Sequence, residues 1–115
     1  DNASRFGVGV VQKILAAHLG RDTFYNVNFP FCAPDAVSGV RVAAHQRFSR
    51  SPFRYYPSRN DGKFFIAIPE TPTPLDPASD FSLLTHGHAI TVTPLTLRQT
   101  DTSLVAALEG AFAAS

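Results

Sequence analysis

Apolar residues recur at helical spacing near both ends of the chain. Residues 2–19 predict an amphipathic helix, because apolar side chains four positions apart form one broad stripe. The stripe has two rows: Phe6, Val10, Ile14 and Val11, Leu15, Leu19. Asp1 or Asn2 can cap its start, and Gly20 suits the left-handed position after its end. A second helix is predicted over residues 101–114, with Asp101 as its cap and one apolar face: Leu104, Val105, Leu108, Phe112.

Residues 23–29, TFYNVNF, predict a strand that ends at Pro30. Its two faces would be Phe24, Asn26, Asn28 and Tyr25, Val27, Phe29. The asparagines need partners, because an unsatisfied buried amide costs about 1–3 kcal/mol. We expect them to tie down adjacent loops; contact with a ligand is the alternative. Residues 40–44, VRVAA, begin another strand.

Residues 80–97, DFSLLTHGHAITVTPLTL, form the stretch around which the rest is organised, and we expect a strand there. Ile90 and Val92 would share one face and Thr91 and Thr93 the other. Branched side chains at this density favour β structure. Proline donates no ladder hydrogen bond, so Pro94 confines the strand to a sheet edge or marks its end.

A β-hairpin is predicted within residues 23–68, the part of the chain that holds the strands before the central stretch. Asn60-Asp61-Gly62 is a tight-turn signal between RYYP and KFFIAI. An isolated hairpin is only marginally stable, so we expect another surface to cover its apolar groups: Phe53, Tyr55, Phe64, Ile66. Residues 69–79 hold four prolines and predict an extended loop, not a strand.

Bulk properties suit one globular domain or part of one, with 115 residues of which 44% are hydrophobic. The net charge of +1 argues for neither a nucleic-acid nor a membrane partner, and no apolar run reaches the length of a membrane span. The single cysteine, Cys32, excludes an internal disulfide and fits the cytoplasm. No methionine occurs, even at position 1, so we expect the chain to be a piece of something longer.

The histidines offer one candidate for metal chemistry. If residues 86–88 enter a strand, His86 and His88 lie on the same side and could hold a metal with Asp80; surface histidines are the alternative. His18 would interact with the negative end of the first helix. Cys32 has no base at motif spacing, and no Walker A or G-x-S-x-G motif occurs, so no nucleophile is assigned.

Residues 45–65 form a basic and aromatic segment. The cations in it and just before it lie within 23 residues and are opposed only by Asp61: Arg41, Arg47, Arg50, Arg54, Arg59, Lys63. Arginine suits bidentate contacts to phosphate or carboxylate, and the interleaved aromatic rings could stack on bases. Three interpretations remain open: a protein interface or solvated face, a site for a phosphate-bearing small molecule, and a surface for single-stranded nucleic acid.

Two motif pairs carry a family resemblance. The first is Tyr25-Asn26-Val27-Asn28-Phe29-Pro30 followed by Gly39-Val40-Arg41-Val42, and the second is Ser79-Asp80-Phe81 followed by residues 87–95, GHAITVTPL. In order and spacing they resemble the C-terminal half of the SurE survival-protein family of metal-dependent 5′/3′-nucleotidases. That family shows N-x-N-x-P, G-[IV]-R-V and G-Y-[VI]-S-[VI]-T-P-L; His88 stands here at the tyrosine position.

The resemblance implies an α/β fold: the C-terminal half of a SurE-like Rossmann-type α/β sandwich, with a protruding β-hairpin and a C-terminal helix. It implies hydrolysis of nucleoside monophosphates with a divalent metal, Mg or Mn. The family's metal ligands lie in an N-terminal D-D-G segment and later loops that are absent here, so no catalytic, metal or substrate residue is assigned.

The resemblance also implies that this half supplies an edge of the sheet and the contacts between subunits of a homodimer or homotetramer. We expect these interface residues: Arg47, Phe53, Arg54, Tyr55, Tyr56, Phe64, Phe65, Leu104, Leu108, Phe112. The alternative hypothesis is a non-enzymatic module that binds phosphate-rich ligands or single-stranded nucleic acid through the basic aromatic hairpin.

Overall fold

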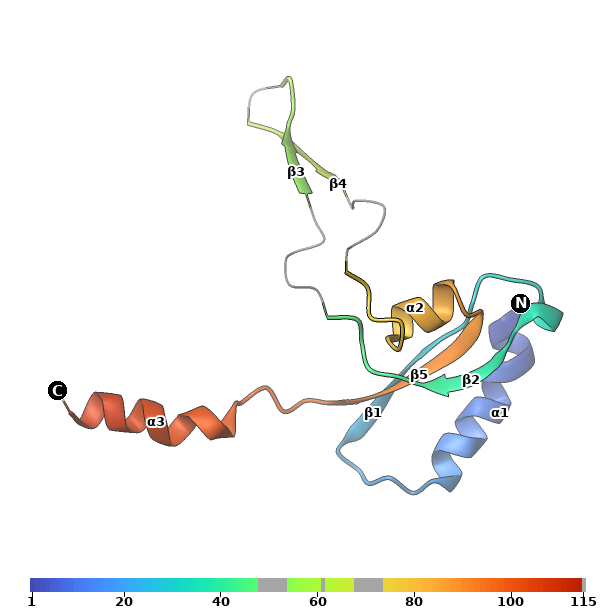
Figure 1. Ribbon diagram of the computed structural model, residues 1–115, viewed down its shortest axis with the longest axis horizontal. Coiled ribbons are helices and arrows are strands. Elements are labelled where there is room, and N and C mark those ends of the chain that lie inside the picture. Colours follow the sequence, from blue (N-terminus) through green and yellow to red (C-terminus); the bar gives the residue numbers. More distant parts are fainter. Residues whose placement is uncertain (48–53, 61, 68–73, 115) are drawn as a thin grey trace.

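A three-stranded mixed sheet carries a helix on each face, and a β-hairpin and a C-terminal helix extend away from it (Figure 1). The computed structural model describes residues 1–47, 54–60, 62–67 and 74–114. The elements are α1 (Asn2–Ala16), β1 (Thr23–Asn28), the 3-10 turn η1 (Pro34–Ala36), β2 (Gly39–Val42), β3 (Arg54–Pro57), β4 (Phe64–Ala67), α2 (Asp80–Thr85), β5 (Ala89–Thr96) and α3 (Thr102–Ala113).

Strand β5 lies in the middle of the sheet, between antiparallel β1 and parallel β2. The expectation that Pro94 confines this strand to an edge, or ends it, is wrong. The last β2 partner along β5 is Val92, whose carbonyl accepts from the N–H of Ala43 at 3.1 Å. In a parallel ladder the next bond would run from the N–H of residue 94 to the carbonyl of Ala43, and proline has no N–H to donate. Pairing with β2 therefore stops here, whereas the antiparallel pairing with β1 continues to Thr96.

One face of the sheet packs against α1 and forms the hydrophobic core. Val10, Ile90 and Val92 are buried there, and partly buried neighbours pack around them: Phe6, Ile14, Tyr25, Val27, Phe29, Val37. The predicted faces of β1 are therefore confirmed. Only one row of the α1 stripe is covered, however, because Val11, Leu15 and Leu19 are exposed.

The end of α1 comes earlier than the pattern predicts. The helix stops at Ala16, and His18 rather than Gly20 is the first residue with a left-handed backbone, at φ 48°. The N–H of His18 bonds the carbonyl of Leu15 at 3.3 Å, so its backbone satisfies the helix end.

The opposite face of the sheet is polar and is covered by α2. Asn26 pairs in register with Thr93, and Asn28 with Thr91, so amides and hydroxyls alternate across two strands. The expectation of a strand from residue 80 fails here, because Asp80–Thr85 is helical. Ser79 caps this helix by accepting from the N–H of Ser82, a signal that a serine before a short apolar run can give.

The hairpin of β3 and β4 pairs as the turn signal predicts. Tyr55 lies opposite Ile66 and Tyr56 opposite Phe65. Gly62 has φ 76°, a left-handed conformation that glycine adopts without strain. Both faces of this ribbon are exposed, which leaves its aromatic rings uncovered within the described residues.

Two features make the chain extended rather than compact (Figure 1). Its radius of gyration is 19.9 Å, against about 13 Å for a compact chain near this length. The hairpin and α3 stand off the sheet, and the residues of α3 are exposed along its whole length. Within the described ranges, no helix combines the length and hydropathy that crossing a membrane requires.

Strand β2 forms an open edge of the sheet. It pairs with β5 alone among the described strands, and all of its residues are exposed. Val40 and Val42 pair with the core residues Ile90 and Val92, so they point to the face that α1 covers elsewhere. They are nevertheless 47% and 75% exposed. The core face therefore ends unfinished at β2.

Candidate functional site

Asp80, the first residue of α2, gathers a cluster of polar groups where the chain leaves β2. Its Oδ2 lies 2.6 Å from Nδ1 of His45, and its Oδ1 accepts from the N–H of Gln46 at 2.8 Å and of Phe81 at 2.7 Å. The side chain of Asp80 is 13% exposed, and that of His45 is 45% exposed. A carboxylate with three donors is well satisfied at this depth.

Two opposing effects set the pKa of the Asp80 carboxyl. Partial burial raises it, whereas hydrogen bonds from His45, Gln46 and Phe81 and the charge of His45 lower it; the net effect is a pKa below the ordinary value. Asp80 is therefore ionised at neutral pH. Since a carboxylate only accepts, the proton of a neutral His45 lies on Nδ1, and Nε2 keeps its lone pair.

Further bonds make this cluster a clasp between two distant segments. The N–H of Asp80 donates to the carbonyl of Ala44 at 2.9 Å, and the N–H of Asp76 donates to Oε1 of Gln46 at 3.0 Å. We call these segments, residues 44–46 and 76–81, the clasp. It closes the base of the excursion that carries β3 and β4.

A pocket of about 350 Å³ lies beside the clasp. It is lined by Asn28, His45, Gln46, Asp80, Phe81 and Leu84. The amide of Asn28 is held by its neighbour, since its Nδ2 donates to Oδ1 of Asn26 at 2.7 Å. The asparagines thus bond each other, and the expectation that they tie down loops is wrong for this bond.

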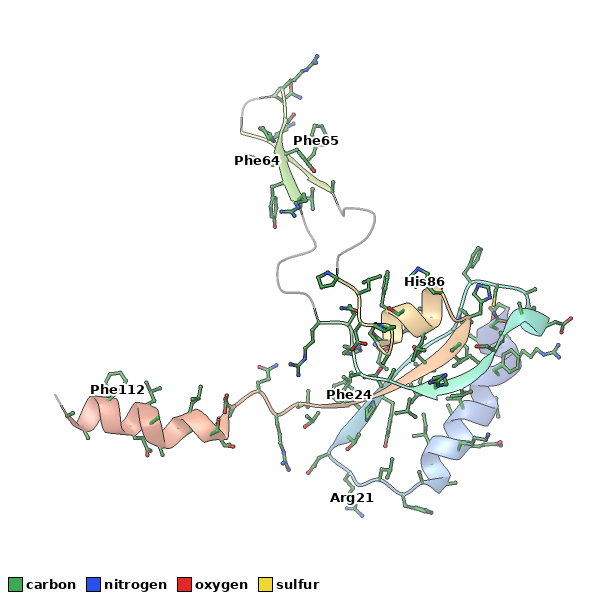
Figure 2. The ribbon with its side chains drawn as sticks, viewed as in Figure 1. Arg21, Phe24, Phe64, Phe65, His86 and Phe112 are labelled. Carbon is green, nitrogen blue, oxygen red and sulfur yellow. The ribbon has the colours of Figure 1, made fainter. Side chains whose placement is uncertain are left out.

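The expected arrangement of His86 and His88 is also wrong. His86 lies at the C-terminal end of α2 (Figure 2), and His88 has a left-handed backbone with φ 50°, so the pair does not enter a strand together. Asp80 bonds His45 instead. Among the described residues, no group of three or more histidine, cysteine or acidic side chains could hold a metal ion.

The loop around Cys32 is held by an amide. Nδ2 of buried Asn2 donates to the carbonyls of Pro30 at 2.8 Å and Cys32 at 2.9 Å, while Asp1 caps α1 through the N–H of Ser4. The thiol of Cys32 is free and partly buried. This region anchors α1 to the end of β1.

The expected interface residues fall on the two projecting elements. Tyr55, Tyr56, Phe64 and Phe65 of the hairpin are 52–68% exposed, and Arg54 opens β3. Figure 2 shows Phe64 and Phe65 on the hairpin and Phe112 on α3. Leu104, Leu108 and Phe112 are 60–75% exposed. Arg47 is exposed beside the clasp, whereas Phe53 and the basic residue Arg50 lie outside the described residues.

The clasp and its pocket were missed by the sequence analysis. His45 and Asp80 lie far apart in the chain, and only the parallel pairing of β2 with β5 brings them together. One feature of the sequence could have indicated part of this site. Ser79 is a typical helix cap, and it predicts that a helix begins at Asp80.

Comparison with known proteins finds similar sequences and similar solved structures, with SurE proteins among both. The chain is 40% identical over 98 residues to the 5′-nucleotidase SurE of Methylocella silvestris, with 82% of this chain and 38% of the relative covered. It is 38% identical over 120 residues to that of Dinoroseobacter shibae, covering 98% and 46%. With that of Afipia carboxidovorans it shares 33% over 105 residues, covering 88% and 41%.

The crystal structure of the SurE protein from Aquifex aeolicus matches with a TM-score of 0.71 at 21% identity, covering 96% of this chain and 45% of that one. This confirms the α/β fold class. No model of a protein family matches the sequence. The resemblance to SurE is thus confirmed, and the chain spans less than half the length of the relatives it matches.

Proposed function

We propose that this chain, which is similar over most of its length to SurE proteins, forms the C-terminal half of a SurE-like 5′-nucleotidase. The observation that carries the proposal is the unfinished core face at β2. Val40 and Val42 are exposed on an open strand edge whose inner partners, Ile90 and Val92, are buried. A further strand with its own covering helix would complete both the ladder and the core.

The substrates of the whole protein would be nucleoside 5′- or 3′-monophosphates, hydrolysed to nucleoside and phosphate. A divalent metal, Mg or Mn, is the cofactor that the family resemblance implies. The described residues do not fit such a metal, since they hold no suitable ligand group. We propose, as the resemblance implies, that the metal ligands lie outside this chain, and we derive no step through the metal from its residues.

The assay that tests this function uses the full-length protein. Release of phosphate from nucleoside monophosphates is measured with added Mg or Mn and then with a chelator. We expect metal-dependent turnover that the chelator abolishes. Absence of turnover with both metals on every nucleoside monophosphate would reject the function, and turnover by the 115-residue segment alone would reject our placement of the metal ligands.

We further propose that β3–β4 and α3 form the contacts of a homodimer or homotetramer. Phe64 and Phe65 lie on opposite faces of the ribbon and both are exposed, so a second copy would have to cover both faces. Continuous apolar exposure on α3, at Leu104 and Leu108, supports the same role.

The oligomer test is a molar-mass measurement in solution. Tyr56→Ser combined with Phe65→Ser removes one cross-strand pair of rings and should shift the protein toward monomer. Phe31→Ser is the matched control, because Phe31 is a fully exposed ring outside both elements. A mass unchanged by the double substitution, or lowered equally by the control, would contradict the proposed interface.

A further inference from the structure

We propose that the pocket beside the clasp binds the nucleoside part of the substrate, with Nε2 of His45 as its polar contact. The inference rests on the proposed nucleotidase function and goes beyond it by naming where this half of the protein meets the substrate. The residues involved line one pocket: Asn28, His45, Gln46, Asp80, Phe81, Leu84.

The imidazole of His45 is held in one orientation through one ring nitrogen, and its other ring nitrogen is available for a ligand. Its Nδ1 is held by Asp80 at 2.6 Å, which fixes the ring and its tautomer. The ring is 45% exposed, and within the described residues Nε2 has no hydrogen-bond partner. A structural histidine needs only the first bond. The second nitrogen is left as a directed acceptor, or as a donor when the ring is protonated, on the wall of a pocket.

The remaining walls suit a ring that is flat and apolar on its faces and polar on its edge. Phe81 and Leu84 supply partly buried apolar surface. Asn28 supplies an amide whose orientation is set by Asn26, and its Oδ1 is free to accept. At about 350 Å³ the pocket lies at the small end of the roughly 300–1,000 Å³ range of ligand sites, which suits a nucleoside.

The residue paired with Asn28 on the neighbouring strand also carries a buried polar group. Thr91 pairs in register with Asn28, is 0% exposed, and its Oγ1 finds no partner among the described residues. A buried hydroxyl without a partner is uncommon and calls for an explanation, and a ligand site beside it is one such explanation.

The position of the pocket agrees with how α/β sheets bind ligands. His45 follows the carboxyl end of β2, which runs parallel to β5. In open α/β sheets, ligands occupy the space beyond the carboxyl ends of parallel strands. The clasp holds His45 at that end, at the root of the hairpin.

The experiment uses the full-length protein and the variant His45→Asn. The amide nitrogen of asparagine can replace Nδ1 in the bond to Asp80, whereas nothing replaces Nε2. The kcat and KM values are measured for a nucleoside monophosphate and for the phosphate ester of a short alkyl alcohol, which lacks base and ribose. Binding of adenosine and of cytidine is measured separately by calorimetry. His86→Asn, on an exposed histidine outside this pocket, is the matched control.

We expect His45→Asn to raise KM for the nucleotide, and to weaken nucleoside binding, by about 3- to 10-fold, the effect of one lost hydrogen bond. The alkyl phosphate and the control should show no change. Unchanged values for nucleotide and nucleoside, or equal losses on both phosphate esters, would overturn the inference. If the protein hydrolyses nothing, the proposed function fails, and the subsite is then judged on nucleoside binding alone: saturable binding lost in His45→Asn supports it, and no binding refutes it.

Discussion

Nδ1 of His45 and Oδ2 of Asp80 lie 2.6 Å apart although 35 positions of sequence separate the two residues. The carboxylate that begins α2 thereby also holds the segment that leaves β2. Because the excursion with β3 and β4 lies between these residues, the pair fixes where that hairpin is rooted on the sheet.

Removal of the carboxylate should destabilise the protein. Asp80→Ala leaves the N–H groups of Gln46 and Phe81 and the ring of His45 without their acceptor, and we expect the free energy of unfolding to fall by about 2–3 kcal/mol. Denaturant titration measures this. Asp35→Ala, on exposed η1, should change it by less than about 0.5 kcal/mol. An equal effect of the two substitutions would show that the clasp contributes nothing.

Acid should weaken the clasp within a defined range of pH. The pKa of Asp80 is lower in the folded protein than the ordinary value of 3.8, so the unfolded chain takes up a proton first. The stabilisation is complete above that ordinary value and is lost as pH falls through the lower folded pKa. Unfolding free energies measured from pH 6 downward should decline more steeply below about pH 4 for the wild type than for Asp80→Asn. Parallel profiles would contradict the assignment.

Gly87, in the turn between α2 and β5, should not tolerate a side chain. A Cβ there would lie 2.8 Å from the backbone oxygen of Leu83, which cannot move without disturbing α2. We expect Gly87→Ala to lower the melting temperature, at a cost of about 1–3 kcal/mol. Gly9→Ala, with open space around its Cβ inside α1, should instead stabilise by up to about 1 kcal/mol. A melting temperature unchanged by Gly87→Ala would show that the turn can rearrange.

Removal of the Thr93 hydroxyl should make the folded protein more stable. The residue is 4% exposed, and its Oγ1 has no partner within the described residues, so its desolvation is not repaid. Thr93→Val keeps the branched shape and should raise the free energy of unfolding by about 1 kcal/mol. Thr96→Val at the exposed end of β5 is the comparison: its Oγ1 accepts from the N–H of Arg98 at 3.3 Å, so this substitution should not stabilise the protein. A loss of stability at Thr93 would reveal a hydrogen-bond partner outside this part of the chain.

Local pattern predicted the faces of β1 and the hairpin, because both depend on alternation and turn chemistry that neighbouring residues carry. Tyr25, Val27 and Phe29 face the core as expected. The same reasoning failed at Pro94, since a proline interrupts pairing only on the side that its nitrogen faces, and β5 continues on the β1 side.

The candidate site could not be predicted in the same way. The His45–Asp80 pair depends on the placement of α2 over the polar face of the sheet, and no local period encodes that placement. His86 and His88 are close to Asp80 in the sequence, which suggested that the three side chains meet. In the structure Asp80 begins α2 and His86 follows its end, and the carboxylate of Asp80 bonds His45 instead.

The unpaired side of β2 also bears on how this segment would behave by itself. A strand with free N–H and C=O groups and the exposed valines Val40 and Val42 can add any extended chain, including another copy of itself. If no further strand covers this edge, we expect the segment to add copies of itself and to form insoluble assemblies, and co-expression with the proposed neighbouring half should improve its recovery from cells.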